Sequence, residues 1–140
     1  MKAIFLSLAF LVLCAGCTSV SVRKAPHVDL AKYQRIFVLQ PFNENHHIDE
    51  FLVDELNRAG KTASSGPLTM MPEETDAVLA YDTRWTWDFT TYLIEIDVSL
   101  RTAHTNKPIA QARYYQPSAR PKKPEAVVHE IVQRLFAGGT

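Results

Sequence analysis

The chain has 140 residues, in which fifteen lysines and arginines balance fifteen aspartates and glutamates. This neutral balance argues against a nucleic-acid-binding protein, whose contact surface is strongly basic. The length is enough for one domain with a substantial hydrophobic core.

The first seventeen residues have the layout of a bacterial export signal. Met1 and Lys2 form a short positive region, and residues 3–13 form an apolar run, shorter than the about twenty residues that span a membrane. Ala15, Gly16 and Cys17 then resemble the lipobox of bacterial lipoproteins, with Cys14 where leucine is usual. The resemblance implies a cleaved signal peptide, residues 1–16, and acylation of Cys17. The alternative is an ordinary secretion signal followed by a chance cysteine.

A lipidated Cys17 would hold the protein on a membrane through its N-terminal acyl chains. Thr18 follows it, where aspartate would favour the inner membrane. By resemblance to enterobacterial sorting we therefore expect a lipid-anchored protein on the periplasmic face of the outer membrane. Processing would leave no free thiol, which excludes a disulfide, a thiolate metal site and a cysteine nucleophile.

The rest of the chain is divided into a tether and one domain. Residues 17–29 show no clear periodicity and are interpreted as lipid anchor and tether, and residues 30–140 as a single domain. In that domain a short apolar run at residues 35–42 is typical of a buried strand.

An amphipathic helix is predicted next, over residues 47–59. Its N-cap is expected at Asn43 or Asn45, and Gly60 provides a C-terminal stop. A further short strand is expected at residues 68–71.

The clearest strand signal covers residues 76–102. Odd positions from 77 to 89 are mostly apolar or aromatic, whereas even positions become polar, as in a half-buried antiparallel strand. After Thr90 and Thr91 the alternation resumes, which predicts a β-hairpin. The expected inward residues of its second strand are Tyr92, Ile94, Ile96, Val98 and Leu100.

A third strand is predicted over residues 109–115, then a loop over 116–123. Pro124 suits the first position of a second helix, which Gly138 ends. The order is strand, helix, a possible strand, three strands and a helix. It predicts an α+β fold in which two helices lie on one face of a mostly antiparallel sheet.

Candidate catalytic groups are sparse. His46, His47 and Glu50 offer metal ligands at a helix start, but a third well-placed ligand is missing. Asp82 and Asp88 are six residues apart on one strand, about 20 Å, too far for a catalytic carboxylate pair. With no nucleophile elbow or phosphate loop, we expect no enzyme activity, no cofactor and no metal.

Two groups of residues are candidates for contact with a partner. The aromatic residues Trp85, Trp87, Phe89 and Tyr92 form either part of the core or a recognition surface at the hairpin tip. Between residues 99 and 124 there are six basic and no acidic residues, which form either a solvated face or a contact for an anionic partner. They are Arg101, Lys107, Arg113, Arg120, Lys122 and Lys123.

The motif Tyr-Asp-x-x-Trp-x-Trp-Asp at residues 81–88 resembles a group of small Gram-negative lipoproteins of unknown activity, over residues 30–137. More distantly, residues 36–44 and the helix after them are similar to the opening of envelope assembly lipoproteins. Examples are the curli-secretion lipoprotein and the activators of penicillin-binding proteins. These resemblances imply a role in binding or assembly.

The leading hypothesis is an outer-membrane lipoprotein whose non-enzymatic periplasmic domain binds a partner protein or an envelope polymer. The alternative is a carrier or sensor of a small envelope ligand held in an aromatic pocket. Beside the lipid-attachment residue Cys17, the expected contact residues are Trp87, Asp88, Phe89, Tyr92, Arg113, Arg120, Lys122 and Lys123.

Overall fold

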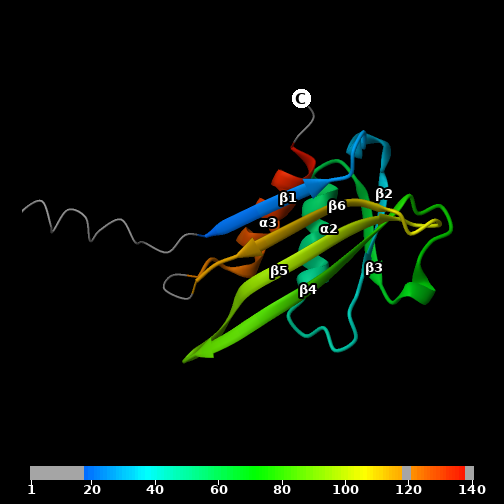
Figure 1. Cartoon of the computed structure of the whole chain (residues 1–140). Coiled ribbons are helices and arrows are strands. Elements are labelled where there is room, and N and C mark those ends of the chain that lie inside the picture. Colours follow the sequence, from blue (N-terminus) through cyan, green and yellow to red (C-terminus); the bar gives the residue numbers. More distant parts are fainter. Residues whose placement is uncertain (1–17, 118–120, 138–140) are drawn as a thin grey trace, which may run out of the picture.

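A six-stranded mixed sheet forms one layer of the protein, and helices α2 and α3 cover one of its faces (Figure 1). The computed structural model describes residues 18–117 and 121–137, so Cys17 and Arg120 lie outside the described residues. The strands are β1 (Ser19–Lys24), β2 (Arg35–Leu39), β3 (Thr62–Gly66), β4 (Ala77–Asp88), β5 (Thr90–Thr102) and β6 (Pro108–Tyr115). The helices are α2 (Ile48–Arg58), α3 (Pro124–Phe136) and the 3-10 turns η1 (Leu30–Lys32) and η2 (Leu68–Met70). This arrangement confirms the predicted α+β class.

The strand order is β1-β6-β5-β4-β2-β3. β4, β5, β6 and β1 pair antiparallel in succession, whereas β2 pairs parallel with both β3 and β4. The β2–β3 pair needs a crossover, and α2 supplies it. Among the described residues, no helix is long and apolar enough to cross a membrane.

The core lies between the sheet and the two helices. Their apolar stripes, predicted from helical spacing, are buried against the inward side chains of the strands, except for Phe51 and Phe136, which are partly buried. The buried helix residues are Ile48, Leu52 and Leu56 of α2 and Val127, Val128, Ile131, Val132 and Leu135 of α3. Pro124 begins α3, as predicted.

The expected tether is wrong over much of its length, because Ser19–Lys24 forms edge strand β1 and pairs with β6. Val20 and Val22 point inward and pack against the core, while Ser21 is exposed. This period-two alternation is a strand signal, although the polar residues between the valines obscure it. The first strand of the fold therefore begins only two residues after Cys17.

Two other local predictions are also wrong. Residues 68–70 form the 3-10 turn η2 and not a strand. The edge strand is β3 instead, which the sequence did not indicate because its small polar residues lack a hydrophobic pattern. Its Ser65 faces α2, where its Oγ donates a 2.9 Å hydrogen bond to Asp49 Oδ2. The N-cap of α2 is His47, in a left-handed conformation without a side-chain cap.

The β4–β5 hairpin contains a β-bulge that the alternation did not predict. Arg84 pairs with Glu95, but Trp85 pairs with Leu93, so Ile94 is the extra residue. The bulge reverses the orientation of the residues before it in β5. Leu93 is therefore buried in place of Ile94 and Tyr92, which are only half-buried.

Candidate functional site

The strand register defines one end of the sheet, called here the proximal end. Ser19 of β1 pairs with Tyr115 of β6, Tyr115 with Glu95 of β5, and Glu95 with Arg84 of β4. These four residues form a row across the sheet. The chain enters the fold at this row, because β1 begins there.

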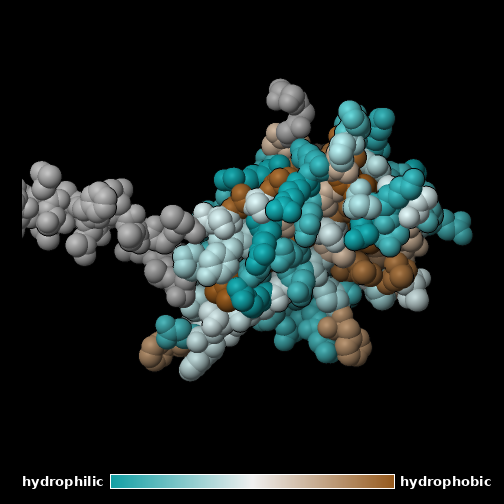
Figure 2. Space-filling view, viewed as in Figure 1, coloured by the Kyte–Doolittle hydropathy of each residue, from teal (hydrophilic) through white to brown (hydrophobic). Residues whose placement is uncertain are grey.

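The β4–β5 hairpin continues past this row as an arm, residues 85–93. Trp87 and Phe89 near its tip are 71% and 90% exposed, with ring centroids 6.5 Å apart. Figure 2 shows hydrophobic atoms projecting where Figure 1 places the tip. These two aromatic residues are therefore exposed at the hairpin tip and are not part of the core.

The turn at the tip is formed by Phe89, which lies between the paired residues Asp88 and Thr90. Its φ is +60°, in the left-handed region that bulky residues rarely adopt. A large apolar side chain is therefore kept at a position that is both strained and exposed. Such strain typically marks a functional position.

The base of the arm is held by Trp85, which is half-buried against the core. Its ring stacks on His46 at a centroid distance of 3.8 Å, and its Nε1 donates a 3.0 Å hydrogen bond to Thr83 Oγ1. In the same loop as His46, Glu44 Oε2 accepts a 2.6 Å hydrogen bond from Tyr81 Oη. Burial and this carboxylate raise the pKa of Tyr81 above its ordinary value. The arm is thus fixed at its base and free at its tip.

The aromatic residues of the arm do not enclose a ligand cavity. Trp85 lines a shallow pocket of about 250 Å³ with the 41–46 loop, Asp82 and Thr83. Trp87 and Phe89 extend into solvent instead. The structure thus gives no support to an aromatic pocket as a carrier site.

The sheet face opposite the helices, called here the open face, carries a cluster of charges. Glu95 is 7% exposed and forms ion pairs with Arg84 at 2.5 Å and with Arg113. Arg113 Nε also lies 3.8 Å from Asp97 Oδ1. The polar face of β4 is thus paired in part with the charges of β5 and β6. Arg113, grouped in sequence with the other basic residues as a contact for an anionic partner, belongs to β6 and faces two carboxylates.

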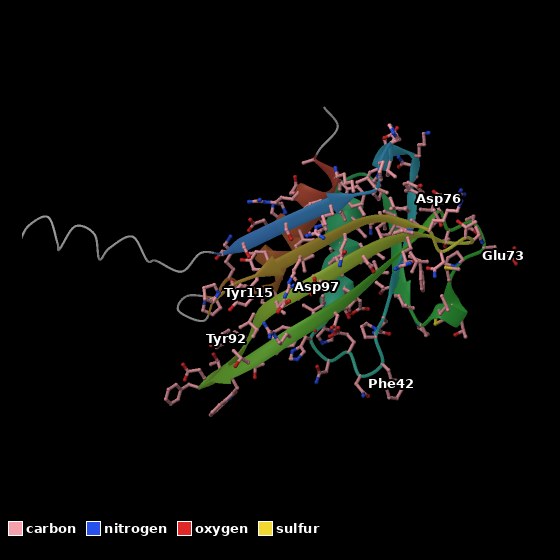
Figure 3. All side chains as sticks on the ribbon, in the orientation of Figure 1. Phe42, Glu73, Asp76, Tyr92, Asp97 and Tyr115 are labelled. Carbon is pink, nitrogen blue, oxygen red and sulfur yellow. The ribbon has the colours of Figure 1, made fainter. Side chains whose placement is uncertain are left out.

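Asp97 is the unusual acid of the open face (Figure 3). Burial raises its pKa, and the nearby carboxylates of Glu95 and Asp82 raise it further, against the opposing effect of Arg113. Asp82 and Asp97 are direct cross-strand partners. Like charges opposite each other are unfavourable in a sheet.

The loop after β6, described at residues 116–117 and 121–123, meets the proximal end through Gln116, which is 2% exposed. The Gln116 side chain donates to Leu93 O at 2.6 Å and accepts from Lys122 N at 2.9 Å. Lys122 Nζ is paired with Glu130 at 2.8 Å, whereas Lys123 is exposed just before α3. The loop therefore lies beside the base of the arm.

The structure thus collects most of the predicted contact residues at one end of the sheet. Trp87, Asp88, Phe89 and Tyr92 share the arm, and the two described lysines lie at its base. Sequence reasoning missed Tyr115, which is 39% exposed at the proximal end, where Figure 3 also shows Tyr92. Its outward position beside the inward-facing Tyr114 is the signal that could have identified it.

The metal-site candidates at the start of α2 do not converge. His47 Nδ1 pairs with Glu50 at 3.0 Å, while the His46 ring is stacked on Trp85. No cluster of three or more potential metal ligands occurs within residues 18–117 and 121–137.

No protein-family model and no curated protein matches the chain. Solved structures do. The PelC dodecamer from Paraburkholderia phytofirmans aligns at a TM-score of 0.60 and 12% identity, over 84% of this chain and 99% of that chain. A PDZ domain protein from Parabacteroides distasonis aligns at a TM-score of 0.51 and 9% identity, over 95% of this chain and 40% of that chain. A minor lipoprotein from Acinetobacter baumannii has a TM-score of 0.41 and 12% identity, over 76% of this chain and 91% of that chain.

At these identities the similarity concerns the fold. It shows that the arrangement of sheet and helices is shared with other bacterial proteins, PelC among them.

Proposed function

We propose that this protein is a lipid-anchored component of the bacterial outer membrane, and that its periplasmic domain works by binding rather than by catalysis. The anchor is Cys17, proposed from the signal sequence. The partner is a protein or an envelope polymer, and it docks on the open face along the proximal end of the sheet.

One observation supports this proposal. In the described part of the chain the helices lie on one face of the sheet, and the open face carries an ordered array of charges that ends in the aromatic arm. Arg84 and Arg113 have more than half of their side-chain surface exposed while they hold the buried Glu95 between them. Such an array presents fixed charges of both signs to a partner, which favours specificity.

Site-specific crosslinking in cells tests the docking surface. A photocrosslinking amino acid at Asp82 and at Gln111, both exposed on the open face, is expected to capture the same partner. The matched control is Asp54, which is exposed on α2, in the helical layer. Equal capture from all three positions, or capture from Asp54 alone, would show that the docking surface is elsewhere.

The anchor is tested separately with Cys17→Ser. The wild-type chain is expected to incorporate labelled palmitate and to fractionate with the outer membrane, and the variant to do neither. A variant that keeps both properties would exclude lipid attachment at Cys17.

A second candidate function is self-assembly, which two observations support. PelC, whose fold is similar, is described as a dodecamer. In addition, β1 is an edge strand of six residues, whose outer side forms no pairing in the described sheet. Mass measurement of the purified protein in detergent distinguishes a monomer from an assembly, and a monomer would remove this candidate.

A further inference from the structure

We propose that the tip of the hairpin arm, Trp87 and Phe89, enters the interfacial layer of the same bilayer that holds the lipid of Cys17. The inference rests on the proposed lipid anchor and goes beyond it, because it adds a second, protein-made membrane contact. This contact would fix the orientation of the domain on the membrane.

The first argument is one of reach. Arg84 lies in the same row as Ser19, and the chain continues for five more residues to Phe89, about 16 Å at the rise of a strand. Cys17 precedes Ser19 by two residues, which span at most about 7 Å. The tip therefore reaches roughly 9 Å further in the direction of the anchor than the anchor residue can.

The direction of the arm supports the same conclusion. β1 begins at the proximal end, and the arm leaves the sheet at that end (Figure 1). A domain held at Cys17 with its strands roughly along the membrane normal would place the tip below the surface. Interfacial protein segments are buried about 5–10 Å at the boundary between headgroups and acyl chains, which matches the excess reach.

The second argument is the chemistry of the residues. Phe89 and Trp87 are adjacent exposed rings at the tip, whereas Tyr92 lies nearer to the row and Tyr115 belongs to it. Tryptophan and tyrosine are enriched at membrane interfaces, where an apolar ring and a polar atom meet different surroundings. The order from tip to row is thus from the apolar phenylalanine to the amphipathic tyrosines.

The charges near the tip limit the depth of insertion. Asp88 is exposed between the two rings, and its carboxylate must stay hydrated or in the headgroup layer. Lys123 is exposed and directly follows Lys122, whose backbone N donates to Gln116 at the base of the arm, so its charge is available to anionic headgroups near the surface. Both features favour an interfacial position over penetration of the hydrocarbon core.

The test uses the full mature lipoprotein, purified from cells and reconstituted in vesicles of phosphatidylethanolamine and phosphatidylglycerol. Because the acylated chain offers no other free thiol, Phe89→Cys can carry a single environment-sensitive NBD label. The matched control is His104→Cys, exposed in the turn at the other end of β5. Circular dichroism checks that both variants are folded.

We expect a several-fold rise and a blue shift of NBD emission at position 89 on reconstitution in the vesicles, with no change at position 104. Unchanged emission at position 89 in palmitate-labelled protein would overturn the inference and leave the proposed anchor intact. An equal rise at both positions would overturn it as well, because the domain would then lie along the membrane. Absence of palmitate would overturn the anchor itself and this inference with it.

Discussion

Because of the β-bulge at the base of the arm, substitutions at Leu93 and Ile94 are expected to rank in stability opposite to the order that simple alternation predicts. Leu93 is fully buried and Ile94, the extra residue of the bulge, is half-buried. Leu93→Ala should therefore remove buried methyl groups from the core, at a cost of about 3 kcal/mol in the free energy of unfolding. Ile94→Ala removes a similar volume from a partly solvated side chain and should cost about 1 kcal/mol or less.

Urea denaturation of the soluble Cys17→Ser mature form measures both values, and equal slopes against urea would show that the unfolded states are comparable. Thermal unfolding should rank the variants in the same order, with the melting temperature of Leu93→Ala lower by roughly 10 °C or more for a domain of this size. If Ile94→Ala is the more destabilising change, the register of the hairpin is wrong, and so is the position of the arm that depends on it.

Three further results are expected. Phe89→Gly should raise the free energy of unfolding by about 0.5–1 kcal/mol, because glycine adopts φ of +60° without strain, yet it should weaken vesicle binding; a loss of stability on denaturation would contradict this. Val22→Asp should lower the free energy of unfolding by about 2 kcal/mol or more, because it places a charge against the core, whereas Ser21→Asp on the exposed side of β1 should be nearly neutral. Equal effects of the two changes in thermal melts would show that residues 18–24 are a tether and not a strand. The raised pKa of Asp97 means that its ionisation opposes folding as the pH rises from 3.8 through the folded-state value, so Asp97→Asn should melt higher than wild type at pH 7 and not at pH 3, and a gain of the same size at both values would exclude this cause.

Much of the fold could be predicted from the sequence, because its periodicities are strong. The stripe of α3 and the long alternation of β4 each specify one buried face, and both were identified. The elements that were missed carry weak local signals. β3 is a string of small polar residues, held in place by β2 and by the contact of Ser65 with α2.

The contact surface was harder to predict than the fold. Alternation alone cannot tell how far a hairpin extends beyond the layer that covers it, so Trp85 and Trp87 look equivalent in sequence although one packs on His46 and the other is exposed. Likewise, Arg113 looks like part of a basic stretch, because its partner Glu95 comes from another strand. Both the environment of Trp85 and the ion pair of Arg113 depend on residues that are distant in the sequence.

The position of β1 has a mechanical consequence for an anchored domain. A pull on a lipid at Cys17 would act along the axis of β1, while the hydrogen bonds to β6 run across that axis. The load would then fall on all of these bonds together, in shear, instead of opening them one at a time. An edge strand attached in this way would let an anchored domain bear tension without being peeled from its own sheet.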